Sequence, residues 1–146
     1  MPHRRHQPGR VGLTTSESQP APIAVVGGSL AGYHACVRLR QLGYDGQVVV
    51  FDADPNPAYQ RPPLSKQYLT GRFGRSDVRL PQWPSGIQVH TGCEVLAADL
   101  EAACLRLANG DSARFSGLVV ATGLSPILPT ALRLGPGEET APVGVL

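Results

Sequence analysis

The sequence predicts an α/β fold, in which a parallel sheet is completed through a small antiparallel β-meander. Three observations support this prediction. Two mainly apolar runs, at residues 23–27 and 47–52, enclose a stretch of helical periodicity, which is the pattern of a βαβ unit with strands buried on both faces. A Gly-rich turn connects the first run to the helix. Further along, short strand-like segments between residues 95 and 115 precede another apolar run at residues 118–121.

The βαβ unit is expected to begin with a strand at Ile23–Gly27 and to end with a second strand at Gln47–Asp52. Between them we expect a helix from Leu30 to Leu42, followed by Gly43, a residue suited to a C-terminal cap. Helical spacing predicts an apolar face and a water-facing side for this helix. The apolar face consists of Ala31, Ala35, Leu39 and Leu42, and the water-facing side of Arg38, Arg40 and Gln41.

The remaining elements are shorter. Residues 55–84 have the composition of a loop with one short helix over Leu64–Leu69, and Gly86–His90 follows as a third parallel strand. The meander is expected at Val95–Ala98, Cys104–Ala108 and Ala113–Phe115. Asn109-Gly110 lies between the last two segments and is a strong hairpin signal. Leu118–Ala121 is expected to return the chain to the parallel sheet.

The formal net charge of +2 arises at the N-terminus, because the basic and acidic side chains beyond residue 20 cancel. Residues 1–21 are rich in Pro, Gly, Ser and Thr without periodicity, and we expect a disordered tail there and one folded domain over 22–146. Three arginines without interleaved aromatic residues make a weak nucleic-acid footprint, so no nucleic-acid partner is expected. No apolar run approaches the ~20 residues of a membrane span, so we expect no membrane association.

The cysteines Cys36, Cys93 and Cys104 are far apart and lack C-x-x-C or C-x₄-C spacing. This spacing indicates neither a metal site nor a redox-active disulfide, and we expect small buried hydrophobic side chains instead. Because no secretory signal follows the N-terminal arginines, a reducing, cytoplasmic location is expected.

The Gly-rich turn is the part of the sequence that predicts binding of a dinucleotide. A turn that binds a pyrophosphate must let the backbone approach the ligand without an intervening Cβ, and must then pack the helix closely on the strand. Gly27 suits the tight turn and Gly32 the helix–strand contact. Ser29 occupies the middle position of the G-x-G-x-x-G pattern, where its hydroxyl is expected either to cap the helix or to bond a phosphate oxygen, and Gly28 recovers some of the lost space.

An acidic residue at the end of the second strand strengthens the dinucleotide interpretation. Asp52 lies twenty positions beyond Gly32, and Asp54 twenty-two, the interval at which a carboxylate accepts hydrogen bonds from an adenosine ribose. A tight strand-to-helix turn without any ligand remains the alternative.

Several segments together resemble the oxygenase-coupled, NADH-dependent ferredoxin reductases, the FAD-dependent group that includes putidaredoxin reductase. The matching segments are Val26–Gly32, Leu39–Tyr44, Tyr59–Lys66, Tyr68–Leu69 with Gly71, Thr91–Val95, Asn109-Gly110 and Leu118–Pro126. The resemblance covers essentially residues 22–146 and implies a Rossmann-like FAD-binding sheet. Within the wider pyridine nucleotide-disulfide oxidoreductase superfamily, the disulfide reductases have a C-x₄-C pair after the second strand, where this chain has Pro-Pro-Leu-Ser-Lys.

The resemblance also implies residue roles. The implied cofactor-binding positions are Gly27, Gly28, Ser29, Leu30, Ala31, Gly32, Asp52, Ala53, Asp54, Arg61, Lys66, Val95, Ala121, Thr122 and Gly123. Backbone amides around Ala31 would meet the FAD pyrophosphate. Asp54, where the family usually has Glu, would face the adenosine ribose, with Asp52 as the fallback.

Lys66 is the implied catalytic residue, because its ammonium would reach flavin N5 and stabilise charge on the reduced ring. Arg61 would lie near the adenosine and phosphates, and Val95 would meet the adenine through its backbone. The alternative for both basic residues is a solvated surface charge, although Pro62-Pro63 stiffens the loop that carries them.

The family reaction moves a hydride from NADH to FAD and then electrons to a ferredoxin-type [2Fe–2S] protein. From the resemblance we expect this sequence to be incomplete relative to the family's full chain, without the second Gly-rich unit for NADH, the return segment to the FAD and the C-terminal domain. We therefore expect the first half of an FAD domain, with a second polypeptide as one source of the rest. The alternatives are a truncated or degenerate nucleotide-binding module without catalysis, and a single-Rossmann NAD(P)-linked enzyme.

Overall fold

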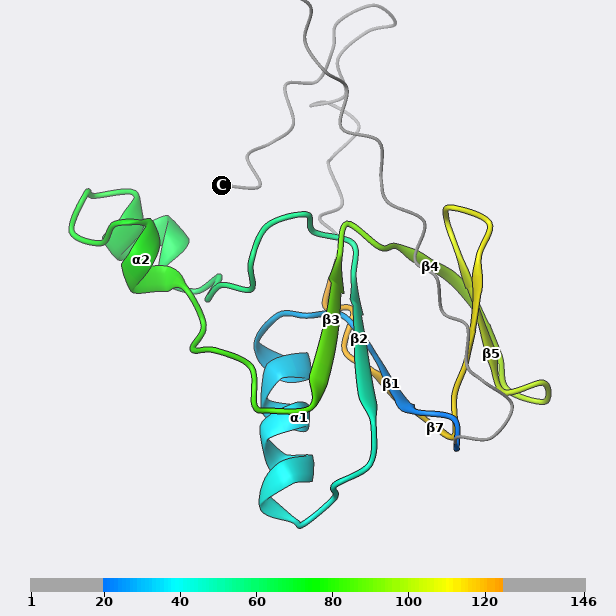
Figure 1. Cartoon of the computed structure of the whole chain (residues 1–146). Coiled ribbons are helices and arrows are strands. Elements are labelled where there is room, and N and C mark those ends of the chain that lie inside the picture. Colours follow the sequence, from blue (N-terminus) through cyan, green and yellow to red (C-terminus); the bar gives the residue numbers. More distant parts are fainter. Residues whose placement is uncertain (1–19, 125–146) are drawn as a thin grey trace, which may run out of the picture.

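The computed structural model describes residues 20–124, so residues 1–19 of the expected tail and everything after residue 124 lie outside it. Its elements, in chain order, are β1 (Ile23–Val26), α1 (Leu30–Gln41), β2 (Val48–Asp52), η1 (Leu64–Tyr68), α2 (Arg75–Val78), β3 (Ile87–Thr91), β4 (Val95–Asp99), β5 (Cys104–Leu107), β6 (Ser112–Arg114) and β7 (Gly117–Val120). Figure 1 shows α1 on one side of the strands β3, β2, β1 and β7, and the antiparallel strands β4 and β5 on the other side.

Four strands form a parallel sheet in the order β3-β2-β1-β7, and β4-β5-β6 form a separate antiparallel sheet. The antiparallel strands are the crossover between β3 and β7, as the sequence predicted. The turn at Asn109-Gly110 joins β5 to β6, where Gly110 has a positive φ of 87°. The predicted α/β fold with a meander crossover is confirmed.

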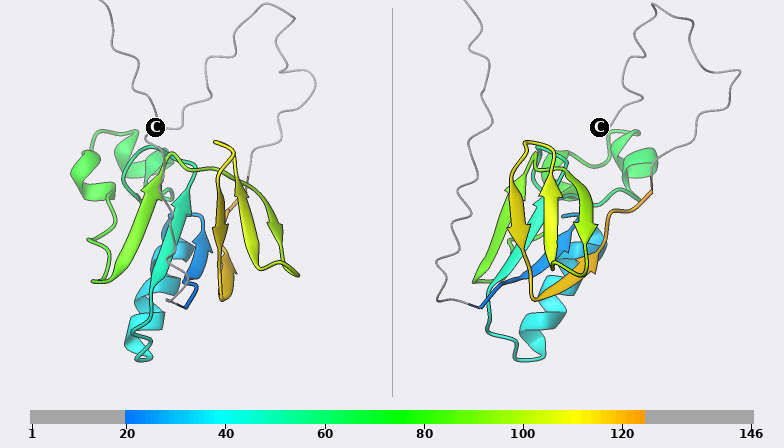
Figure 2. Two further views of the ribbon diagram at one scale, coloured as in Figure 1. Left: turned by 45° about the vertical axis from the view of Figure 1, so that its right-hand side comes forward. Right: turned by 90° about the vertical axis from the view of Figure 1, so that its right-hand side faces the viewer.

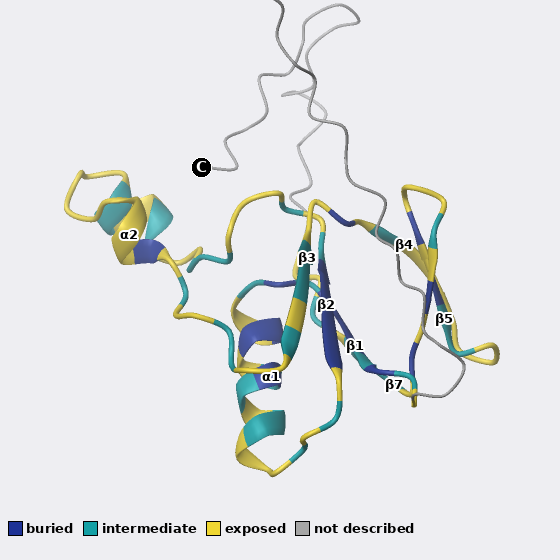
Figure 3. Ribbon diagram, viewed as in Figure 1, coloured by how far each residue is buried: buried dark blue, intermediate teal, exposed yellow. Residues whose placement is uncertain are grey.

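The two faces of the parallel sheet each have their own core. On one face Ala24, Val49 and Phe51 pack with Leu105 and Leu107 of the meander. On the other face the core consists of Val25, Cys36, Val48 and Val50, with Leu39, Tyr44 and Trp83 packed against it. Burial on both faces explains why β1 and β2 lack the alternating pattern of half-exposed strands, and both strands are largely buried in Figure 3.

The buried face of α1 differs from the prediction. Gly32, Tyr33 and Cys36 are buried, whereas Ala31 is exposed and the side chain of Leu42 is 67% exposed. The contact between α1 and β1 sets this rotation, because a Cβ on Gly32 would clash with the Gly27 carbonyl. The residue that must approach the strand most closely therefore decides which side of a weakly amphipathic helix faces the sheet.

Arg40 does not face water as predicted. Its guanidinium donates hydrogen bonds to four carbonyl oxygens, those of Tyr44 (2.6 Å), Gly46 (3.0 Å), Ser85 (3.2 Å) and Gly86 (2.9 Å). The acceptors belong to the segment before β2 and to the turn before β3, so the side chain joins three elements at the amino edge of the sheet.

The predicted C-terminal cap at Gly43 is confirmed. Gly43 has a φ of 82°, and its amide donates to the Arg40 carbonyl, while the Tyr44 amide donates to the Leu39 carbonyl. This pair of bonds is a Schellman motif, and Tyr44 and Leu39 both pack against the same core.

Residues 55–84 contain more structure than the sequence predicted. The short helix over Leu64–Leu69 exists, but as the π-helix η1, in which the Leu69 amide donates to the Leu64 carbonyl five residues earlier. The four-residue helix α2 was missed, because its start depends on a single bond from the Gly74 amide to the Asp77 carboxylate (2.7 Å). Figure 2 shows both helices together in a lobe beside the sheet.

Candidate functional site

The Gly-rich turn lies at the carboxyl edge of the parallel sheet, between the ends of three strands. The Gly27 amide donates to the Phe51 carbonyl of β2 (2.8 Å), and the Ala121 amide after β7 donates to the Val26 carbonyl of β1 (2.8 Å). Gly27 has a φ of 103°, and a Cβ there would clash with the Ala121 carbonyl. This position therefore requires glycine both for its backbone conformation and for the space that it leaves.

The start of α1 presents free backbone donors. Within residues 20–124, the amides of Leu30, Ala31 and Gly32 donate no hydrogen bond, while the next amide, of Tyr33, bonds the Ser29 carbonyl (2.9 Å). No acidic residue occupies the first turn. These amides and the positive end of the helix dipole are the kind of donors that an anion such as the pyrophosphate of a dinucleotide requires.

Ser29 is the N-cap residue of α1, with extended backbone angles, but its hydroxyl makes no capping hydrogen bond to a described residue. Of the two roles predicted for this hydroxyl, helix capping is thus not observed. The hydroxyl stays available for a ligand on the turn.

Asp52 and Asp54 have different surroundings. Asp52, at the end of β2, accepts one hydrogen bond at its Oδ1, from the Asp54 amide (3.3 Å), and its Oδ2 lies against Gly28, where an added Cβ would clash with it. Asp54 accepts three hydrogen bonds, from the Asn56 amide and side chain (both 2.9 Å) and from the Tyr59 hydroxyl (3.2 Å).

The structure brings four of the predicted site residues around one small hollow, namely Ser29, Asp52, Asp54 and Arg61. Asn56, Ala58 and Tyr59 complete its lining. Lys66 and Val95 are not among these residues. Lys66 is an exposed side chain of η1, and the Val95 side chain packs against the meander core.

The other predicted positions lie on the surface near this edge. Ala53, Thr122 and Gly123 are exposed, while Ala121 is half-buried against the turn. Their predicted contacts with a cofactor remain predictions.

The hydrogen bond from the Tyr59 hydroxyl to the Asp54 carboxylate was not predicted from the sequence. Burial, and secondly the Asp54 carboxylate, raise the pKa of the Tyr59 hydroxyl, so the hydroxyl keeps its proton and remains a donor. The Asp-Pro-Asn spacing is the signal that indicates the local part of this cluster, because an Asp side chain readily accepts from the backbone two residues later.

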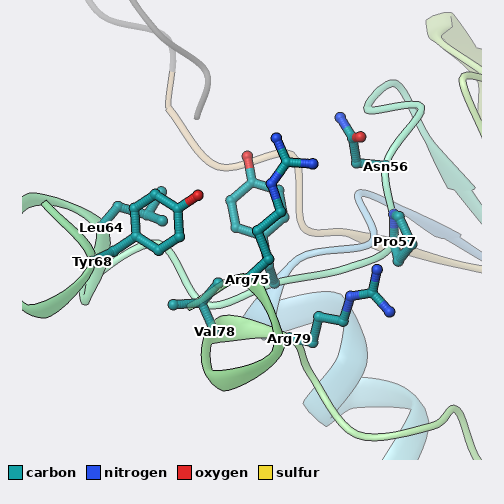
Figure 4. A pocket seen from close by; sticks show the side chains of 8 residues that line it. Asn56, Pro57, Leu64, Tyr68, Arg75, Val78 and Arg79 are labelled. Carbon is teal, nitrogen blue, oxygen red and sulfur yellow. The ribbon is translucent and has the colours of Figure 1, made fainter. Parts of the chain in front are cut away.

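A second hollow lies between the helical lobe and the loop after β2. Leu64 and Tyr68 form one side of it, and Arg79 and Asn56 lie on the opposite side (Figure 4). Its volume is about 310 Å³, and it contains none of the predicted site residues.

No group of three or more His, Cys, Asp or Glu side chains that could hold a metal ion occurs among residues 20–124. In the same part of the chain, no helix is both long enough and apolar enough to span a membrane.

A parallel sheet, a glycine turn with free amides and a carboxylate after the second strand define a Rossmann-like nucleotide-binding domain. The family model of the pyridine nucleotide-disulphide oxidoreductases matches residues 21–141. The chain belongs to this family.

Individual relatives agree with this assignment. The chain is 34% identical over 122 residues to a monodehydroascorbate reductase of Pisum sativum, covering 72% of this chain and 28% of the relative. It is 32% identical over 110 residues to a probable ferredoxin reductase of Castellaniella defragrans, covering 71% of this chain and 26% of the relative. Among solved structures, putidaredoxin reductase in its covalent complex with putidaredoxin superposes with a TM-score of 0.71 at 28% identity, covering 79% of this chain and 29% of that one.

The chain therefore spans less than a third of the length of these relatives. The predicted resemblance to ferredoxin reductases is confirmed.

Proposed function

We propose that this chain is the first part of the FAD-binding domain of a flavoprotein oxidoreductase that takes hydride from NADH and passes electrons to a ferredoxin-type [2Fe–2S] protein. The observation that carries the proposal is the Gly27–Gly32 turn, whose free amides lie at the carboxyl edge of a parallel sheet next to the carboxylates of Asp52 and Asp54. The relatives named as ferredoxin reductases support the electron acceptor.

FAD, when bound, would supply a hydride acceptor that releases its electrons singly. This chain's part would be binding and orientation. The amides of Leu30, Ala31 and Gly32 would hold the pyrophosphate, and Arg61, which lines the adjoining hollow, would add positive charge near the phosphates. An aspartate would hold the ribose.

Lys66 would place an ammonium near flavin N5, where negative charge develops on reduction. Its exposure leaves the side chain free to reach a ligand that extends past the turn. The segments that bring NADH and the iron–sulfur protein to the flavin would come from a longer form of the protein or from a second polypeptide.

The visible spectrum of the purified chain, with FAD added where needed, tests this function. We expect flavin bands near ~450 nm that stay with the protein through gel filtration. A colourless protein that FAD does not reconstitute would contradict the proposal.

Addition of NADH then separates an enzyme from a binding module. Bleaching of the bound flavin by NADH would establish the reductase half-reaction. Retention of FAD without bleaching is the outcome for a module that binds but does not turn over.

A Lys66→Ala variant tests the proposed catalytic role, and Arg72→Ala, an exposed charge of the same lobe, is the matched control. We expect Lys66→Ala to bind FAD but to change the flavin spectrum and its rate of reduction by dithionite or NADH, and Arg72→Ala to change neither. Spectra and rates equal to those of the unaltered protein would count against the role of Lys66.

A further inference from the structure

The hollow between the helical lobe (η1 and α2) and the loop after β2 shares no lining residue with the predicted FAD site. Its volume of about 310 Å³ is near the lower end of the range for small-molecule sites. Two guanidinium groups, of Arg75 and Arg79, line it together with aromatic and aliphatic side chains, those of Tyr59, Leu64, Tyr68 and Val78. Its described lining residues include no carboxylate. The hollow is therefore positively charged at one part of its wall and apolar at the rest.

The loop and the lobe are joined beside this hollow by backbone pairing. The Gln60 amide donates to the Val78 carbonyl (2.6 Å), next to an antiparallel bridge between Tyr59 and Arg79. This pairing fixes the position of the loop relative to α2. A ligand in the hollow would therefore have little backbone to order, which lowers the cost of binding.

The two arginines belong to one face of α2 and of the residue that follows it. Arg75, Val78 and Arg79 are spaced by three and four residues, the interval at which helical positions lie on the same side. Leu64 and Tyr68 of η1 lie across the hollow from Arg79 (Figure 4). The guanidinium groups and the apolar wall thus face a common space.

Neither guanidinium group is neutralised within the described part of the chain. Among residues 20–124, the side chains of Arg75 and Arg79 form no ion pair and donate no hydrogen bond. Asp77, the acidic residue of α2, accepts a bond from the Gly74 amide (2.7 Å). Two like charges at one hollow favour an anion beside them, and a guanidinium group can donate two parallel hydrogen bonds to a carboxylate.

The other polar groups of the wall already have partners. The Tyr59 hydroxyl donates to the Asp54 carboxylate (3.2 Å), and the Asn56 side chain donates to the same carboxylate (2.9 Å). The free donors of the hollow are thus its arginines, and the remaining surface consists of rings and aliphatic groups. A planar apolar group would cover this surface, whereas a small inorganic anion would leave it in contact with water.

We propose that this hollow is a second ligand site, which binds a small aromatic carboxylate. The carboxylate of the ligand accepts hydrogen bonds from Arg75 and Arg79, and its ring lies against Leu64 and Tyr68. The site goes beyond the proposed function, because it needs no bound FAD. A ligand there joins the lobe that carries Lys66 to the loop after β2.

The test uses benzoate as the probe and the complete 146-residue chain, with dissociation constants measured by NMR shift titration at constant ionic strength. Benzamide has the same ring without the charge, and acetate has the charge without the ring. We expect benzoate to shift the backbone amide signals of Gln60 and Arg79. It should bind about tenfold or more tightly than benzamide, as for hydrogen bonds to a charged group. Acetate should bind more weakly than benzoate, because it buries less apolar area.

Variants of the exposed arginines locate the site. Arg75→Gln and Arg79→Gln should each weaken benzoate binding several-fold and leave benzamide binding nearly unchanged. Arg79→Lys should recover part of the benzoate affinity, since it keeps the charge without the planar fork. Arg72→Gln, an exposed arginine of the same lobe outside the hollow, is the matched control and should change neither constant. The amide spectrum of each variant without ligand reports whether the fold is retained.

Three results would overturn the site: no response to benzoate, equal constants for benzoate and benzamide, or equal weakening in Arg72→Gln and Arg79→Gln. A fourth is benzoate binding at the Gly27–Gly32 turn, seen as shifts of those amides and as displacement by ADP, which carries the ribose and diphosphate of FAD. The proposed function is tested separately. A chain that retains FAD but does not respond to benzoate would contradict the second site alone.

Discussion

Arg40 shows how a single charged side chain stabilises this domain. Its four hydrogen bonds go to carbonyls of the segment before β2 and of the turn before β3. We expect Arg40→Ala to lower the free energy of unfolding by about 1–3 kcal/mol, because hydrogen bonds to charged groups are stronger than neutral ones and the freed carbonyls lose their donors. Urea unfolding followed by circular dichroism measures the change.

The matched control is Arg38→Ala on the same helix. Arg38 is exposed and makes one long bond, to the Gln41 side chain (3.4 Å), so the change should stay within about 0.5 kcal/mol. Equal effects of the two substitutions would contradict the role assigned to Arg40.

His90 is expected to make the stability of the folded chain depend on pH. Its ring stacks on Phe51, and its Nε2 is buried without a partner among the described residues. Burial lowers the pKa of His90 below 6.5, so the unfolded chain binds the proton more tightly than the folded chain. The His90 contribution is therefore complete above pH 6.5 and decreases as the pH falls below that value.

We expect the melting temperature to fall between pH 7.5 and pH 5.5, and His90→Phe, which keeps an aromatic ring at this position, to reduce the fall. His34→Gln, at an exposed position, should leave the fall unchanged. A pH dependence that persists in full in His90→Phe would exclude His90 as its source.

At the scale of elements, glycine has different roles in the turn between β1 and α1 and at the C-terminal end of α1. Gly27 and Gly43 both have positive φ values, but a Cβ at Gly27 would clash with the Ala121 carbonyl, whereas nothing lies within 4 Å of one at Gly43. Gly43→Ala should therefore cost only the left-handed backbone penalty of about 1–2 kcal/mol.

Gly27→Ala adds a steric conflict between β1 and β7 to that penalty. We expect a clearly larger loss of stability than for Gly43→Ala, together with loss of ADP binding, measured by thermal melting and NMR titration. A Gly27→Ala protein as stable as Gly43→Ala would show that the turn is less constrained than the structure indicates.

At the scale of the whole molecule, the meander and the parallel sheet share one core. Leu105 of β5 is fully buried and packs in the same cluster as Val49 and Phe51 of β2. We expect Leu105→Ala to cost about 2–5 kcal/mol and to lower the stability of both sheets in a single transition.

Leu96→Ala, in β4, is the control, because its side chain is 56% exposed and its loss should change stability little. If tryptophan fluorescence of Trp83, packed on the opposite core, melted separately from the circular dichroism signal in Leu105→Ala, the two layers would unfold independently.

The strand segments and the position of the turn could be predicted because both depend on local patterns. Apolar runs, the Asn109-Gly110 turn and the Gly27–Gly32 spacing each report a backbone preference within a few residues. The rotation of α1 and the role of Arg40 could not be predicted, since both depend on residues distant in sequence: Gly32 against Gly27, and Arg40 against the turn before β3.

The same division applies to the site. The sequence by itself determined the parallel sheet, the Gly-rich turn, the two candidate aspartates and the family. Only the tertiary structure distinguished those aspartates: the Asp54 carboxylate accepts a hydrogen bond from the Tyr59 hydroxyl, whereas the Asp52 carboxylate accepts one from the Asp54 amide and lies against Gly28. Acceptor capacity depends on the donors that folding brings near, and spacing along the chain does not record them.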